Sequence, residues 1–249
     1  MDDYTQGLEG RVALVTGGAR RIGAAIVRVL HGAGMDVALH YRRSRGAAEA
    51  LAAELNAVRP RSVALHRADL LAAGAVDRLI EEVVDGAGRL DVLVNNASNF
   101  YATPVGCATD EVWDDLVGAN LKVPFFLAQA AAPYLRLGHG CIVNLADVHG
   151  LSPLRDHAVY SITKAGVVML TRALARDLGP DVRVNAVAPG AILWPEQGLD
   201  EVTQRRVISR TSLKRQGRPE DVARTVLFLV RDADYITGQV IRVDGGRQA

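Results

Sequence analysis

The chain has 249 residues, of which 49% are hydrophobic and 23% charged, and its formal net charge is +1. This size and apolar fraction predict one compact domain spanning residues 1–249. The small net charge argues against nucleic acid or an anionic membrane surface as the main partner. The two cysteines have no metal or redox spacing, residues 1–10 carry acids rather than a basic signal region, and no apolar run approaches a membrane span. We therefore expect a cytoplasmic protein without a metal site.

Predicted strands and helices alternate along the whole chain. Short apolar runs predict strands at residues 12–16, 36–40, 63–67, 92–95, 141–145, 183–188 and 240–243. Helical periodicity predicts helices between them, at residues 21–33, 47–58, 75–85, 110–137, 158–178 and 219–231. Such alternation predicts an α/β fold, a Rossmann-type doubly wound parallel sheet with helices on both faces. The long irregular segment 189–217 is typical of a lid.

The turn after the first strand has the composition of a phosphate-binding loop. A strand, a glycine-bearing turn and a helix place free N–H groups and the helix dipole where an anion can bind. An ordinary βα turn is the alternative. If the turn binds a dinucleotide, its pyrophosphate is expected to contact Gly17, Arg20, Arg21, Ile22 and Gly23.

The end of the second strand favours NADPH over NADH. Enzymes that use NAD usually place an acid there to hold the ribose hydroxyls, but in this chain no acid follows the end of the strand at His40 until Glu49. Guanidinium forks and a hydroxyl suit a 2′-phosphate, whereas the alternative is a merely solvated basic loop. The predicted cofactor contacts here are His40, Tyr41, Arg42, Arg43 and Ser44.

A tyrosine and a lysine form the candidate catalytic pair. Tyr160 and Lys164 lie four residues apart in a predicted helix, so they share one face. A neighbouring ammonium favours the ionised phenol and is expected to lower the pKa of Tyr160. Asp147 ends an apolar strand thirteen residues before Tyr160. An isolated Tyr-x-x-x-Lys motif is often only a solvated helix face, so the surrounding motifs decide its meaning.

Those motifs are TGGARRIG, Asp69-Leu70, Asn95-Asn96-Ala97, Asn120, YSITK and APG, in this order along residues 11–246. Their order and intervals resemble the short-chain dehydrogenase/reductase family. The resemblance implies that Asn120 orders a water linked to Lys164, although Asn120 could be only a tolerated polar residue in a helix. It also implies a homotetramer paired through the helices that contain Asn120 and Tyr160. The implied cofactor contacts are Asp69 (to the adenine), Leu70, Asn95, Ala97, Ser98, Tyr160, Lys164, Pro189 and Gly190.

Three residues depart from the commonest pattern of that family. Arg21 and Ser98 replace glycines, and Asp147 replaces a serine. Together with the run NNASNFYATP, these departures resemble the pteridine reductases, including bacterial dihydropteridine and dihydromonapterin reductases. An ionised Asp147 would repel the negative charge that develops on a ketone oxygen. A carboxyl–phenol pair that shares a proton can instead deliver it to a pterin ring nitrogen.

The resemblance therefore predicts an NADPH-dependent pteridine reductase. Phe100 would stack on the flat pterin ring, and Arg21 and Ser98 would bind its edge. Trp194 would touch the substrate's side chain or anchor the lid. The alternatives are a loop aromatic packed on the core for Phe100 and a phosphate or surface contact for Arg21. The predicted substrate-binding residues are therefore Arg21, Ser98, Phe100, Asp147, Tyr160 and Trp194.

Two other functions are compatible with the sequence. One is a short-chain carbonyl reductase acting on 3-oxoacyl or small ketone substrates, which a serine at Asp147 and a glycine at Arg21 would have favoured. The other is an NADP-binding sensor without turnover. The presence of Asn120, Tyr160 and Lys164 argues against a sensor, because a sensor needs no proton donor.

Overall fold

The computed structural model describes residues 7–194 and 198–247. Its centre is a seven-stranded parallel sheet in the order β3-β2-β1-β4-β5-β6-β7. The strands are β1 (Val12–Val15), β2 (Asp36–Tyr41), β3 (Val63–Arg67), β4 (Val92–Asn95), β5 (Cys141–Leu145), β6 (Arg183–Pro189) and β7 (Val240–Val243). The four residues of β1 and the five of β5 are all buried, because both sheet faces are covered.

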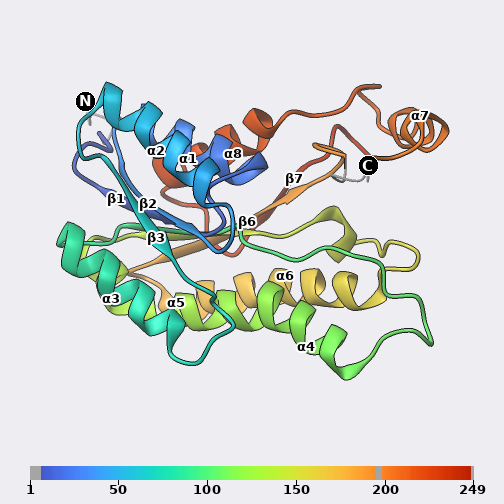
Figure 1. The fold of residues 1–249 in the computed structure, drawn as a ribbon, viewed down its shortest axis with the longest axis horizontal. Coiled ribbons are helices and arrows are strands. Elements are labelled where there is room, and N and C mark those ends of the chain that lie inside the picture. The colour runs from blue at the N-terminus through green and yellow to red at the C-terminus, as the bar shows by residue number, and fades with distance from the viewer. Residues whose placement is uncertain (1–6, 195–197, 248–249) are drawn as a thin grey trace.

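Helices cover both faces of the sheet (Figure 1). One face carries α1 (Arg21–Gly32), α2 (Arg45–Val58) and α8 (Pro219–Arg231). The other carries α3 (Ala75–Ala87), α4 (Asp110–Val117), α5 (Val123–Leu137) and α6 (Ala158–Leu178). This arrangement confirms the predicted doubly wound fold. The strand order reverses between β1 and β4, and ligands of such sheets bind beyond the carboxyl ends of the strands near this switch.

Two predicted elements differ from the structure. The single helix predicted at residues 110–137 is interrupted by a π-helical turn, Gly118–Lys122, which contains Asn120. Such π turns often occur at functional sites. The segment 189–217, predicted to be irregular, contains the helix α7 (Glu201–Ser209), whose first turn is capped by Asp200 accepting from the Thr203 N–H at 2.9 Å. Because residues 195–197 lie outside the described residues, the lid function of this segment stays a prediction.

Candidate active site

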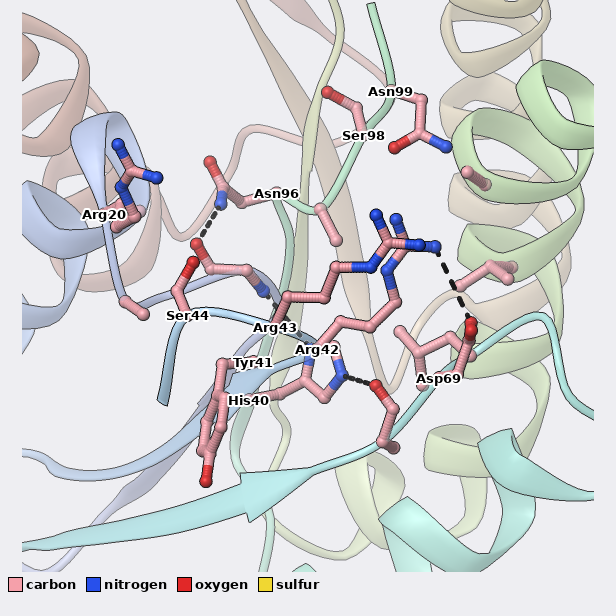
Figure 2. A pocket seen from close by; sticks show the side chains of 18 of the residues that line it. Arg20, His40, Tyr41, Arg42, Arg43, Ser44, Asp69, Asn96, Ser98 and Asn99 are labelled. Carbon is pink, nitrogen blue, oxygen red and sulfur yellow. Dashed lines mark hydrogen bonds and ion pairs between the residues drawn. The ribbon is translucent and has the colours of Figure 1, made fainter. Parts of the chain in front are cut away.

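A cavity of about 590 Å³ lies at the carboxyl ends of β1, β2 and β4. Figure 2 shows its polar end, where arginine side chains from the segment after β2 lie opposite residues that follow β4. Residues at or just after the ends of β1, β2, β3 and β4 supply most of the lining, and all predicted contacts in the first two loops are among them. These are Gly17, Arg20, Arg21, Ile22 and Gly23 from the first loop and His40, Tyr41, Arg42, Arg43 and Ser44 from the second.

The glycine turn is built for close approach of its backbone. Gly17 has φ of 62°, in the left-handed region that favours glycine. A Cβ atom on Gly23 would overlap the Gly17 carbonyl oxygen, so a side chain at Gly23 would break the turn. The turn leads directly into α1, whose N-terminal N–H groups suit a phosphate. This cradle fits the pyrophosphate of a dinucleotide.

His40 supports this turn from β2 rather than presenting its ring to a ligand. Its Nδ1 lies 3.3 Å from the Gly17 amide nitrogen, and its Nε2 lies 3.1 Å from the Ala68 carbonyl oxygen. Burial lowers the pKa of His40, which favours the neutral ring. In the neutral ring, Nδ1 accepts from the Gly17 N–H while the Nε2 N–H donates to Ala68.

The basic segment after β2 has the geometry of a 2′-phosphate site. Arg42, Arg43 and Ser44 all line the cavity, and the guanidinium of Arg42 lies 3.8 Å from the Asp69 carboxylate (Figure 2). Asp69 and Leu70 also line this end, where the resemblance places the adenine. A guanidinium partly balanced by one acid still attracts a phosphate, because Arg forks match phosphate oxygens.

Asn96, rather than the predicted Asn95, lines the cavity. Asn95 pairs in register with Asn144 of β5, and its side chain donates to the Asn144 side chain at 2.9 Å inside the sheet layer. The Asn96 amide donates to the carbonyl oxygens of Thr16 and Gly17 at 2.8 and 3.1 Å. Asn96 therefore fastens the glycine turn to the end of β4. The cavity lining includes Asn96 and not Asn95, because alternate residues at the end of a strand point to opposite faces.

The Thr16 side chain completes this contact, since its Oγ1 accepts from the N–H groups of Asn96 and Ala97, both at 3.0 Å. Ala97 and Ser98 line the cavity as predicted. Pro189 and Gly190, in contrast, end β6 outside the lining of this cavity, where the Gly190 N–H donates to the Val243 carbonyl at 3.0 Å.

The predicted catalytic residues do lie together. The Tyr160 hydroxyl donates to Asp147 Oδ2 at 2.8 Å, while Asp147 Oδ1 accepts from the His149 N–H at 2.8 Å. The Lys164 ammonium donates to the Leu145 carbonyl at 2.8 Å and lies 5.8 Å from the centre of the Tyr160 ring. Helix α6 supplies both Tyr160 and Lys164, and the end of β5 supplies the other partners. The carboxylate is thus the direct partner of the phenol.

This arrangement shifts the pKa of Tyr160 in the direction opposite to the predicted one. Burial, and then the charge and hydrogen bond of Asp147, raise the pKa of Tyr160 well above its ordinary value. The expectation of a lowered pKa was wrong because the phenol is buried and bonds an anion directly, whereas Lys164 is turned toward Leu145. Burial also lowers the pKa of Lys164 from 10.5 to about 8, with Asp147 opposing that shift.

Asn120 lies in the π-helical turn and is almost fully buried. Its Oδ1 accepts from the Asn99 N–H at 2.8 Å, and its Nδ2 donates to the Asn99 carbonyl at 3.0 Å and to Thr163 Oγ1 at 3.2 Å. Asn120 therefore joins the loop after β4 to α6. Its predicted link to Lys164 through an ordered water stays a prediction.

Phe100 lines the cavity and packs against Tyr160. Its ring stacks on His157 at 4.8 Å with an interplanar angle of 17°, and packs edge-on against Tyr160 at 4.8 Å with an angle of 83°. It lines the cavity and is 45% exposed, so it is not a core aromatic. An exposed flat ring beside a proton donor can receive a flat substrate.

Arg21 and Trp194 meet, although they are far apart in the sequence. The Arg21 guanidinium donates to the Trp194 carbonyl at 2.9 Å. Arg21 has φ of 54°, a left-handed conformation that costs a residue other than glycine about 1–3 kcal/mol. The side chain that replaces the usual glycine therefore connects the phosphate turn to the segment after β6.

The fold and this site together define a dinucleotide-dependent oxidoreductase, with a phosphate cradle on one side and a buried tyrosine–lysine pair on the other. The family model described as enoyl-(acyl carrier protein) reductase matches residues 17–248. The chain belongs to the short-chain dehydrogenase/reductase family.

Named relatives cover nearly the whole chain. It is 41% identical to granaticin polyketide synthase putative ketoacyl reductase 2 of Streptomyces violaceoruber, over 97% of this chain and 98% of that protein. It is also 41% identical to 3-oxoacyl-(acyl-carrier-protein) reductase FabG of Staphylococcus aureus strain Mu50, over 94% of this chain and 96% of that protein. These names are those of ketoacyl reductases and not of pteridine reductases.

A solved structure with the same fold is a blue fluorescent protein from a metagenomic library in complex with NADPH. The TM-score is 0.92 and the identity 36%, over 98% of this chain and all of that one. Across residues 7–194 and 198–247, no helix is long and apolar enough to cross a membrane. The same residues contain no cluster of His, Cys, Asp or Glu that could hold a metal ion.

Proposed function

We propose that this chain is an NADPH-dependent pteridine reductase that acts on a dihydropterin or a related pterin or folate. One observation carries the proposal, namely the hydrogen bond between the Tyr160 hydroxyl and the Asp147 carboxylate, at 2.8 Å, where the commonest family pattern has a serine. NADPH, when bound, supplies the hydride. The residues of the chain position the two reactants and move the proton.

The cofactor assignment rests on charge and shape. Gly17 and Gly23 allow the phosphate turn to pack tightly, and Arg42, Arg43 and Ser44 supply two guanidiniums and a hydroxyl for the 2′-phosphate. The similar structure in complex with NADPH supports this choice. Lys164 would hold the nicotinamide ribose, by the family resemblance.

The chemistry of the pair favours protonation of a ring nitrogen. A proton that left Tyr160 alone would leave two neighbouring anions in a buried place, which the raised pKa of Tyr160 disfavours. A pair that carries one additional proton avoids this cost, because the carboxyl returns a proton to the phenol as the phenol donates. A C=N bond accepts such a proton on nitrogen after hydride reaches carbon, whereas a developing ketone oxyanion beside Asp147 would be repelled.

The substrate would lie against Phe100. Its ring is exposed toward the cavity and touches Tyr160 edge-on at 4.8 Å, so a flat heterocycle stacked on Phe100 would approach the tyrosine hydroxyl. Ser98 lines the same cavity and offers a hydroxyl to the edge of the heterocycle. Arg21 and Trp194 meet at the segment after β6, where a substrate side chain would leave the site.

A 3-oxoacyl or small-ketone reductase is the second candidate, and the names of the ketoacyl reductase relatives favour it. The decisive experiment measures NADPH consumption with a panel of dihydropterins, dihydrofolate, a 3-oxoacyl thioester and an activated ketone. The proposal expects kcat/KM on the best pterin to exceed that on every carbonyl compound. Preference for the 3-oxoacyl thioester would establish the second candidate, and tight NADPH binding without any turnover would indicate a sensor.

We also propose that the protein is a homotetramer. Four apolar side chains on α5 and α6 are 41–60% exposed, namely Phe125, Phe126, Ile162 and Met169. A second copy that packed on these helices would bury them, because exposed apolar patches often mark interfaces. Light scattering coupled to size exclusion would measure the mass, and a monomer at micromolar concentration would refute this assignment.

A further inference from the structure

The loop after β4 carries Phe100, and one carboxylate binds both neighbours of that residue. The Asn99 side-chain amide donates to Asp115 Oδ2 at 2.8 Å, and the Tyr101 hydroxyl donates to the same oxygen at 2.7 Å. Asp115 lies on α4, which directly precedes the π-helical turn that contains Asn120.

The rest of the loop is fastened to two other elements. Asn120 binds both backbone groups of Asn99, as described above. Beyond Phe100, the Thr103 N–H donates to the Asp156 carbonyl at 2.6 Å, and Thr103 Oγ1 accepts from the Val159 N–H at 3.3 Å. The loop is thus held before and after Phe100, and Asp115 is the group that holds the side chains directly beside it.

We infer that Asp115 is a positioning residue, which sets where the Phe100 ring lies relative to the Tyr160 hydroxyl. Asn99 and Tyr101 flank Phe100 in the chain, so fixing both on one oxygen leaves the intervening backbone little freedom to rotate. The ring is then held 4.8 Å from the Tyr160 ring, at a fixed edge-on angle. A substrate stacked on Phe100 would be placed by Asp115 without touching it.

The hydrogen bonds from Asn99 and Tyr101 to Asp115 are of a kind that persists across the physiological pH range. Burial, with Asp115 adding to it, raises the pKa of Tyr101 to about 12, so its hydroxyl remains a donor across the physiological range. Hydrogen bonds to a charged acceptor are stronger than those between neutral groups. Asp115 is half-buried, which limits competition from water. The adjacent Asp114 is exposed and offers a matched control.

The kinetic experiment compares three variants of the full-length protein. Asp115→Ala removes the acceptor from both flanking side chains, and we expect KM for the substrate to rise by about tenfold or more while the NADPH Kd stays within about twofold. Asp115→Asn keeps an oxygen acceptor, so its KM should lie close to that of the native protein. Asp114→Ala should match the native protein. Equal rises in KM and in the NADPH Kd, or an unchanged KM in Asp115→Ala, would overturn the inference.

A second measurement requires no turnover. The chain has four phenylalanines, so para-fluorophenylalanine labelling gives four fluorine NMR signals, and Phe100→Leu identifies the signal of Phe100. We expect Asp115→Ala to shift or broaden that signal and Asp114→Ala to leave it unchanged. An unmoved Phe100 signal in folded Asp115→Ala would refute the positioning role.

The inference rests on the proposed function only for the chemical class of the substrate. If the protein reduces a carbonyl compound instead of a pterin, the same kinetic comparison is made on that compound, and the NMR result is independent of both. A failed pterin assay with a displaced Phe100 signal would therefore reject the pterin as substrate and support the positioning role of Asp115. Good pterin turnover in the native protein, with an unchanged KM and an unmoved Phe100 signal in Asp115→Ala, would support the substrate and reject the positioning role of Asp115.

Discussion

Asp147→Asn is the substitution that tests the proposed chemistry most directly. It removes a negative charge 2.8 Å from the Tyr160 hydroxyl oxygen and preserves the side-chain shape. The His149 N–H donates to Asp147 Oδ1 at 2.8 Å, so the asparagine oxygen should stay on that side and turn its NH2 group toward Tyr160. The phenol then loses its acceptor and has no carboxyl from which to regain a proton.

The expected loss follows from the strength of that bond. A hydrogen bond to a charged group contributes about 1.5–3 kcal/mol, which corresponds to about tenfold to hundredfold in rate if it acts on the reacting state. Pterin turnover in Asp147→Asn should fall by that factor, while NADPH affinity changes little. Because Asp147 raises the pKa of Tyr160, that pKa should also fall in the variant. Asp177→Asn, at an exposed position on the same helix as Tyr160, is the control.

The assay is steady-state kinetics on a dihydropterin and an activated ketone, with NADPH affinity measured by fluorescence titration. Asp147→Ser restores the usual family residue, so pterin turnover should fall while any ketone turnover holds steady or rises. General damage to the fold would lower both. Native activity should decline only at strongly alkaline pH, because burial and the Asp147 carboxylate raise the pKa of Tyr160 well above its ordinary value. Unchanged pterin turnover in Asp147→Asn would refute the reasoning, since the carboxylate would then be only structural.

Three further predictions concern the cofactor and the buried pair. NADPH should bind at least about tenfold tighter than NADH, about 1.4 kcal/mol, and Arg43→Ala should narrow that gap in a titration; equal native affinities would contradict the assignment. Tyr160→Phe should lower turnover by at least about a hundredfold with NADPH binding retained, whereas near-native turnover would exclude Tyr160 as the donor. Without cofactor, Lys164→Met should raise the melting temperature at neutral pH, because burial lowers the pKa of Lys164 to about 8. The unfolded chain therefore binds more protons than the folded one between pH 8 and 10.5, so native stability should rise with pH across that window, and the variant should lose this rise. A lower melting temperature for Lys164→Met at neutral pH would contradict the inference that burying the Lys164 ammonium destabilises the folded chain.

The sequence predicted the sheet well because its strands are short, apolar and fully covered. β3, β4, β5 and β7 have the predicted bounds, and the other strands differ only at one end. The π-helical turn could not be predicted, because periodicity does not distinguish one inserted residue within a long apolar helix. Helix α7 was missed because its residues are mostly polar, although Asp200 before Glu201 is a capping signal.

The site was predicted less completely, because motif order does not give the direction of a side chain. Asn95 and Asn96 are adjacent in one motif, but only the sheet register decides that Asn95 faces Asn144 and Asn96 faces the glycine turn. Likewise, the spacing of Tyr160 and Lys164 predicted their shared helix but not which charge lies nearer the hydroxyl. Electrostatic shifts depend on distances and burial that only the folded chain supplies.

Of the residues that depart from the commonest family pattern, Asp147 and Ser98 lie near the proposed substrate position, and Arg21 lies in the glycine turn. Asp147 accepts the hydrogen bond of the Tyr160 hydroxyl, Ser98 precedes the loop of Phe100, and Arg21 reaches from the phosphate turn to Trp194. The cofactor cradle keeps Gly17 and Gly23 and its basic end. A chain that retained cofactor binding while changing its substrate would keep the cofactor cradle and differ at side chains that face the substrate. The identity to ketoacyl reductases supports the shared fold and an oxidoreductase activity, and the proposed preference for a pterin rests on Asp147 and Phe100.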